Sequence, residues 1–229
     1  MVKKYQITAF ERLEEKPAKP VTKFGGQPDW LEEPQWPVSK HWKDRLMSFV
    51  GQIVLDKGML GNDKDIIAYV FFSHPENRKE RIFYPYMGGW DSGEHAVIIQ
   101  PGGEITCETK NVKEGPCMFG KFGNHYEYIP TLVEGHDPDF INDEEFEEME
   151  DWEQSEYINQ VDGNKIGGIP CLCTYDEWPD DVSEDWKFLL QLVSDDLPFV
   201  LQLEGRLHAF ISSDFKQGGL LIENIDNYY

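Results

Sequence analysis

One spaced motif occurs twice in this sequence, and it constrains the fold more than any other feature. The first copy consists of a lysine, two glycines, two prolines and a tryptophan: Lys23, Gly25, Gly26, Pro28, Trp36 and Pro37. Each of these residues returns 142 positions further along the chain, as Lys165, Gly167, Gly168, Pro170, Trp178 and Pro179. Because self-similarity at a fixed spacing is typical of duplicated architecture, the motif predicts two copies of one unit.

The similarity continues beyond the motif. Apolar residues surround Gln52 and Gln191, and an aromatic-rich run follows at 67–72 and again at 207–211. These apolar runs predict buried strands. A buried amide without a partner costs about 1–3 kcal/mol, so we expect each glutamine to bond to the backbone or to the other glutamine.

The glycine pairs and the tryptophans of the motif favour a structural interpretation. Glycine reaches positive φ easily, and the context of a phosphate-binding loop is missing, so each pair predicts a turn. The proline after each tryptophan favours an extended conformation there. We expect Trp36 and Trp178 in the core, with a surface platform that stacks on sugars as the alternative.

The order Lys-x-Gly-Gly-x-Pro, Trp-Pro, an apolar stretch around glutamine and an aromatic-rich strand resembles the YwqG-like family. That family is similar in turn to the eukaryotic programmed cell death 2 proteins. The resemblance covers roughly residues 20–105 and 160–229. It implies a mainly β, internally duplicated domain. Because the eukaryotic relatives escort a ribosomal protein, it also implies binding rather than catalysis. The chain departs from the family by a long acidic insertion and a short second copy.

The expected fold is therefore mainly β (α+β) and a single domain over residues 1–229. It consists of two pseudo-symmetric antiparallel units, about 20–105 and 163–229, packed core to core. A lone unit of about 65 residues would be marginally stable, which favours one shared core. Residues 4–10 predict a short edge strand, and residues 104–133 predict short strands and turns.

Between the units, residues 134–160 predict one amphipathic helix. Asn142 or Asp143 can cap it, and its first turn is acidic, as the helix dipole prefers. Four apolar residues fall on one broad side at helical spacing: Phe146, Met149, Trp152 and Tyr157. Six of the eight residues from Asp143 to Glu150 are acidic, so the outer face is negative.

Charge sets the expected partner. The formal net charge is −22, with 43 Asp and Glu against 21 Lys and Arg. Such a chain repels phosphate backbones and anionic lipid, which argues against nucleic-acid or membrane binding and favours a basic protein. The alternative is that the charge only keeps the protein soluble and monomeric. Without an apolar signal core or a run of eighteen apolar residues, we expect a cytoplasmic protein.

The predicted contact residues lie in two segments. Residues 88–95 form a polar loop, in which Trp90, Asp91 and Glu94 are candidates for partner binding. A catalytic interpretation of this loop lacks the strand-to-helix elbow that presents a nucleophile. The second segment is the helix, with Glu144, Glu145, Glu147 and Glu148 on its outer face.

The cysteines predict neither a metal nor a cofactor. Cys171 and Cys173 are separated by one residue, whereas zinc knuckles usually have two to four between the ligands. We expect the four cysteines, which include Cys107 and Cys117, to be free thiols.

Two classes of function remain open. The first is a non-enzymatic protein-binding module, either chaperone-like or an immunity-type neutraliser of a basic protein. The second is a carbohydrate-binding or glycan-hydrolysing protein, because seven Trp, ten Tyr and many carboxylates are also typical of glycan sites. A cleft that brings exposed Trp and paired carboxylates together would favour the second class.

Overall fold

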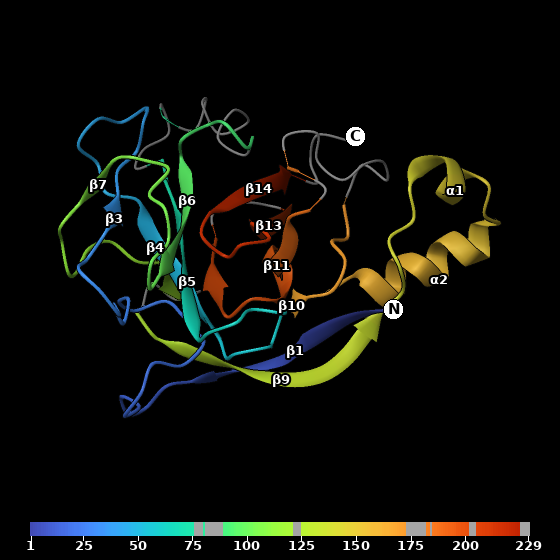
Figure 1. Ribbon diagram of the computed structural model, residues 1–229, viewed down its shortest axis with the longest axis horizontal. Coiled ribbons are helices and arrows are strands. Elements are labelled where there is room, and N and C mark those ends of the chain that lie inside the picture. The colour runs from blue at the N-terminus through green and yellow to red at the C-terminus, as the bar shows by residue number, and fades with distance from the viewer. Residues whose placement is uncertain are drawn as a thin grey trace.

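The computed structural model describes residues 1–75, 80, 89–120, 125–172, 182–183, 185–201 and 205–224. Ten of the described strands form a closed barrel with antiparallel pairing between neighbours (Figure 1). Around the barrel the order is β1 (Val2–Arg12), β10 (Lys165–Gly167), β11 (Lys187–Val193), β13 (Gly205–Ile211), β14 (Gly218–Asn224), β6 (His95–Gln100), β5 (Ile66–Phe72), β4 (Ser48–Leu55), β2 (Lys23–Phe24) and β9 (Tyr128–Asp137). The mainly β expectation is confirmed.

Short elements cover the barrel. Two small sheets pair β3 (Trp36–Pro37) with β7 (Thr109–Lys110), and β8 (Phe119–Gly120) with β12 (Phe199–Val200). A 3₁₀ turn, η2 (Ser194–Asp196), follows β11.

Two runs of consecutive barrel neighbours follow the chain in the same order, β2-β4-β5-β6 and β10-β11-β13-β14. On one side of the barrel, β1 and β9 pair with each other and join the two runs. On the other side, β14 meets β6 where Gly218 lies opposite Val97. We call this short pairing the seam.

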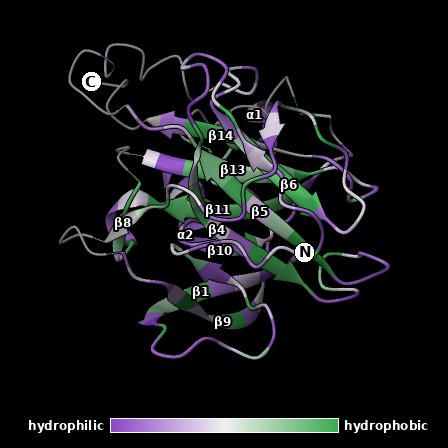
Figure 2. Cartoon of the chain, turned by 90° about the vertical axis from the view of Figure 1, so that its left-hand side faces the viewer, coloured by the Kyte–Doolittle hydropathy of each residue, from purple (hydrophilic) through white to green (hydrophobic). Residues whose placement is uncertain are grey.

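One hydrophobic cluster fills the barrel and draws on both runs. Val50 and Ile53 of β4 lie in the same cluster as Leu190 of β11 and Leu207 of β13. Alternate residues of a strand point to opposite faces, so one side of each of these strands lines the interior. Figure 2 shows hydrophobic stretches along the barrel strands, including β6 and β13.

The first strand differs from the expected edge strand. β1 pairs along its length with β9 and through Lys4, Tyr5 and Gln6 with β10, so both of its edges are occupied. The segment from Glu134 to Asp137, expected to belong to the helical insertion, instead ends β9. Pairing with β1 outweighs the weak strand propensity of this Gly-containing segment.

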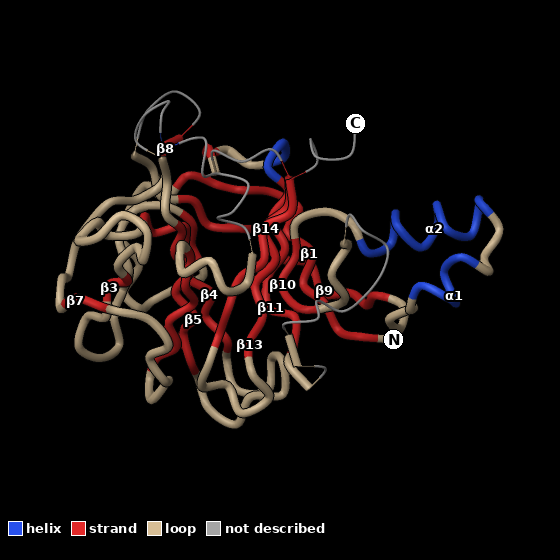
Figure 3. The backbone as a smooth tube through the Cα atoms, turned by 90° about the horizontal axis from the view of Figure 1, so that it is seen from above, coloured by secondary structure: helices blue, strands red, loops and turns tan. Residues whose placement is uncertain are grey.

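The insertion forms two helices rather than one, α1 (Asp143–Glu147) and α2 (Asp151–Val161). Asn142 caps α1, as expected, by accepting a hydrogen bond from the Glu145 N–H at 3.0 Å. Glu150 has an extended backbone (φ −67°, ψ 149°) at the start of α2, so a continuous helix cannot pass through it. Figure 3 shows both helices beside the barrel, at the end where the N-terminus lies.

Candidate functional site

The glutamines of the two runs make matching backbone contacts. The Asp29 N–H donates to Gln52 Oε1 at 2.8 Å, and Gln52 Nε2 donates to the Val21 carbonyl at 2.9 Å. In the second run, the Cys171 N–H donates to Gln191 Oε1 at 2.8 Å. Gln191 Nε2 donates to the Gly163 carbonyl at 2.8 Å. Both amides are therefore satisfied by the backbone, as burial requires, and they are not displayed to a ligand.

The Gly-Gly pairs form tight turns. Gly25 and Gly26 have φ of 76° and 67°, and Gly167 and Gly168 have φ of 70° and 81°. A side chain at Gly26 would overlap Glu127, and one at Gly168 would overlap Asp137, so these turns also need close packing.

The remaining described residues of the motif are structural as well. Trp36 is fully buried and donates its indole N–H to the Met47 carbonyl at 2.7 Å. Pro28, Pro37 and Pro170 are buried too. Trp178 and Pro179 lie outside the described residues.

A buried ion pair anchors the two helices to the barrel. Lys165 and Asp137 are both 0% exposed, and Lys165 Nζ lies 2.7 Å from Asp137 Oδ2. Lys4 Nζ contacts the other carboxylate oxygen at 2.6 Å. Burial lowers the pKa of Lys165 to about 8, although Asp137 raises it.

The same lysines reach the last turn of α2. Lys165 Nζ donates to the Val161 carbonyl, and Lys4 Nζ donates to the Gln160 carbonyl at 2.7 Å. Cations near a helix C-terminus complement its dipole, and α2 has no basic residue of its own there. No sequence pattern predicted this anchor, because Asp137 was assigned to the helical insertion.

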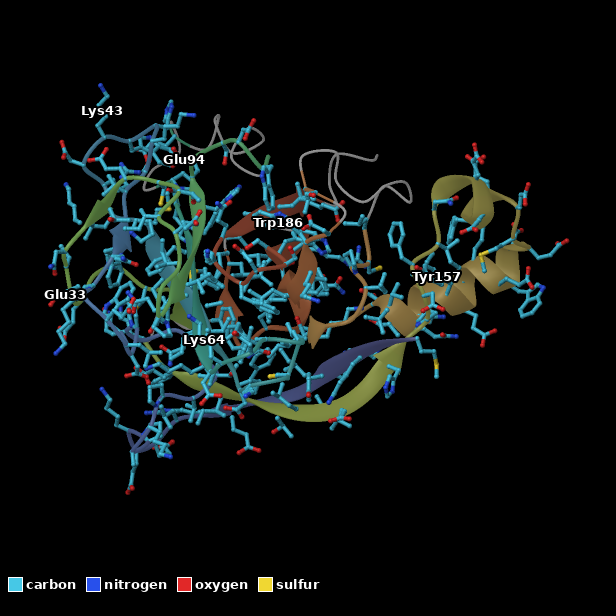
Figure 4. The ribbon with its side chains drawn as sticks, in the orientation of Figure 1. Glu33, Lys43, Lys64, Glu94, Tyr157 and Trp186 are labelled. Carbon is cyan, nitrogen blue, oxygen red and sulfur yellow. The ribbon has the colours of Figure 1, made fainter. Side chains whose placement is uncertain are left out.

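Residues 138–164, which include α1 and α2, are named the acidic arm. They contain no Lys, Arg or His. Glu144, Glu145, Glu147 and Glu148 are exposed, as expected. Phe146 is buried against Tyr157, with ring centroids 6.1 Å apart, and Figure 4 shows Tyr157 among the side chains of the two helices.

Trp152 contradicts the expected inward face. Its relative exposure is 64%, whereas Phe146 on the other helix is 6% exposed. The break before α2 changes the direction of the second helix, so the spacing that placed these residues on one side no longer applies. The acidic arm therefore displays Trp152 among carboxylates, together with the less exposed Phe140.

The loop before β6 is only partly exposed. Glu94 is 2% exposed and accepts hydrogen bonds from Ser39 Oγ and the His41 N–H, both at 2.6 Å. It was expected in a contact surface, but it is buried and holds residues 39 and 41 together through these hydrogen bonds. Trp90 is half-buried and packs edge-to-face on Trp186 at 5.3 Å, whereas Asp91 is exposed.

A cleft of about 790 Å³ lies over the seam. Trp90 and Trp186 contribute to its walls, together with the carboxylates of Asp44, Asp91 and Glu108. Cys107 also lines the cleft, and burial raises the pKa of its thiol to about 11. A neutral thiol is a poor nucleophile, so the cleft is better suited to binding than to thiol chemistry.

Among the residues that the structure describes, no group of three His, Cys, Asp or Glu side chains is arranged to hold a metal ion. Cys107, Cys117 and Cys171 are free thiols. Cys173, the other half of the Cys-x-Cys pair, lies outside the described residues.

Neither the search of family models nor the search of curated proteins finds a match. Within the described residues, no helix has the length and apolar character needed to cross a membrane.

Proposed function

We propose that this protein is a non-enzymatic binding module whose acidic arm holds a basic segment of another protein. The observation that carries the proposal is Trp152, 64% exposed on an arm without any basic residue. An exposed tryptophan flanked by carboxylates offers a lysine or arginine both an aromatic face and a counter-charge. A cation over an indole contributes about 0.5–1 kcal/mol when exposed and about 2 kcal/mol when desolvated.

The arm is also suited to rapid capture. Carboxylates repel one another on the free arm, so a basic partner relieves that repulsion and is steered towards it. Steering raises the association rate and weakens with salt, whereas aromatic contacts act mainly on dissociation. The buried pair of Lys165 and Asp137 holds the base of the arm against the barrel, which limits the ordering cost of binding.

A titration with a fluorescently labelled Lys/Arg-rich peptide tests the proposal. We expect replacement of Glu144, Glu145, Glu147 and Glu148 with Gln to slow association at low salt and to flatten its salt dependence. Trp152→Ala should weaken binding about three- to thirtyfold, mostly through faster dissociation. The control is Asp195→Asn with Asp196→Asn, which removes two acidic charges from η2 outside the arm, against four in the arm variant. Unchanged peptide affinity in both arm variants would refute the proposal.

We further propose that the two runs of strands arose by duplication and that the chain is a YwqG-like protein, distantly similar to the programmed cell death 2 proteins. The support is the matching of contacts as well as residues. Lys23 lies opposite Gln52 as Lys165 lies opposite Gln191. The Val54 N–H donates to Thr22 Oγ1 as the Val193 N–H donates to Asn164 Oδ1, both at 2.8–2.9 Å.

The seam cleft supports a second candidate, carbohydrate binding. Trp90 and Trp186 line the same cavity as Asp91, Asp44 and Glu108, which is the combination of rings and carboxylates that glycan sites use. Calorimetric titration with a panel of neutral oligosaccharides tests this candidate. A saccharide that binds the wild type should bind at least tenfold more weakly to Trp90→Ala, while Trp152→Ala serves as the control. If no oligosaccharide of the panel binds, only the protein-binding candidate remains.

A further inference from the structure

A groove of about 660 Å³ lies where the β4–β5 loop approaches the start of β11. Apolar side chains line most of it, among them Met59, Leu60, Ile169, Trp186 and Phe188. Lys3 and Lys187 also line it. We call it the lysine-rimmed groove, and its size is typical of pockets for small organic ligands.

The loop that forms one wall is pre-organised. Asn62 is 3% exposed, and its side-chain amide donates to the carbonyls of Leu55, Asp56 and Lys64 at 2.9–3.1 Å. Its Oδ1 accepts the Leu60 N–H at 3.1 Å. Because the buried amide fixes the loop, Met59 and Leu60 keep their place in the wall when the groove is empty.

The opposite wall begins at the second Gly-Gly turn. Gly167 packs so closely under Leu60 that a Cβ atom there would lie 2.7 Å from Leu60 Cδ2. Ile169 is 7% exposed and Phe188 is 4% exposed, so the bottom of the groove is apolar and largely closed. Figure 4 shows Trp186 over the strands of the second run.

The charge at the rim is the opposite of the charge of the whole molecule. Lys187 Nζ lies beside Gly61 and 5.8 Å from the centre of the Phe215 ring. Within the described part of the chain, it has no ion pair with a carboxylate. Lys3 is more exposed and already pairs with Glu134 at 3.1 Å. Lys187 is therefore the cation that can meet an anion carried by a ligand.

From this combination we propose that the lysine-rimmed groove binds an aliphatic monocarboxylate, with the hydrocarbon chain along Leu60 and Phe188 and the carboxylate at Lys187. Phe140 of the acidic arm also lines this groove, but the proposed site uses neither Trp152 nor the carboxylates of the arm. An apolar body gains about fourfold in affinity for each methylene group buried, and a charge-assisted hydrogen bond selects the carboxylate end. The net charge of −22 slows entry at low salt, but at physiological ionic strength the field of distant carboxylates is screened beyond about 8 Å.

Intrinsic tryptophan fluorescence and calorimetry of the full chain provide the test, with octanoate, decanoate and dodecanoate below their micellar concentrations. We expect affinity to rise about fourfold per methylene. Decanoate should bind about tenfold more tightly than decan-1-ol. Lys187→Met should abolish that preference while retaining decan-1-ol binding.

The matched control is Lys64→Met, because Lys64 lies at the end of the same loop but does not line the groove (Figure 4). Circular dichroism checks that each variant is folded. If Lys187→Met does not fold, Leu60→Gln tests the apolar wall instead. Equal binding of decanoate and decan-1-ol, equal effects of the two lysine variants, or no binding of any carboxylate would overturn the proposal. A dimer in solution that is dissociated by Leu60→Gln but not by decanoate would also overturn the proposal, because a second copy of the chain would then occupy the groove.

Discussion

Lys165 is a buried cation in a chain of strongly negative charge, and it connects three parts of the molecule. It pairs with Asp137 of β9, contacts the end of α2 and belongs to β10. Removing one partner of a buried pair leaves an uncompensated charge, so Lys165→Met should lower the free energy of unfolding by about 3–5 kcal/mol. Urea denaturation measures this, and Lys165→Met with Asp137→Asn should recover part of the loss.

A pH series provides an independent check of the same side chain. Burial lowers the pKa of Lys165 from 10.5 to about 8, so the unfolded chain holds more protons than the folded chain between these values. Stability should therefore rise with pH across this window, and more in the wild type than in Lys165→Met. Parallel curves for the two proteins would contradict a perturbed lysine.

Single residues were predictable where one force dominates. Burial of Trp36 and backbone pairing of Gln52 follow from apolar context and from the cost of an unpaired amide. Trp152 and Glu94 were not predictable, because the exposure of Trp152 follows from the helix break at Glu150 and the burial of Glu94 depends on residues distant in the chain. Glu94, for example, is buried by Ser39 and His41, which no local pattern connects to it.

Strands and helices were likewise predictable where the residues of the element itself carry a strong pattern. β4, β5 and β13 carry strong apolar runs and lie close to where the sequence places them. Residues 134–137 of β9 were missed because pairing with β1, rather than their own strand propensity, makes them part of a strand, whereas residues 128–133 fall where short strands were expected. The helix break at Glu150 was missed as well, since helical spacing continues across it and a glutamate is ordinarily a good helix former.

The whole barrel should unfold as one cooperative unit. Its interior cluster contains residues of both runs, and β1 bonds to strands on either side of it. Neither run can therefore lose its structure without exposing the apolar face of the other. We expect a single urea transition in which far-UV circular dichroism and tryptophan fluorescence coincide. Two separate transitions would mean that each run folds by itself.

The two cavities could not have been predicted from sequence. The seam cleft and the lysine-rimmed groove each combine loops from opposite halves of the chain, and Trp186 lines both. Their residues show no common spacing, so only the closed barrel brings them together. The acidic arm, in contrast, could be recognised from the sequence, because its carboxylates come from one continuous segment.

The position of β1 has a consequence for synthesis on the ribosome. Its neighbours are residues 128–137 and 165–167, which are translated long after it. At about 5–20 residues per second, β1 waits roughly ten seconds for the first of them. An unpaired strand is an aggregation hazard during such a delay, and charges along it discourage the wrong partners. β1 carries Lys3, Lys4, Glu11 and Arg12. These charges let β1 remain exposed to water in the nascent chain until its partner strands are synthesised.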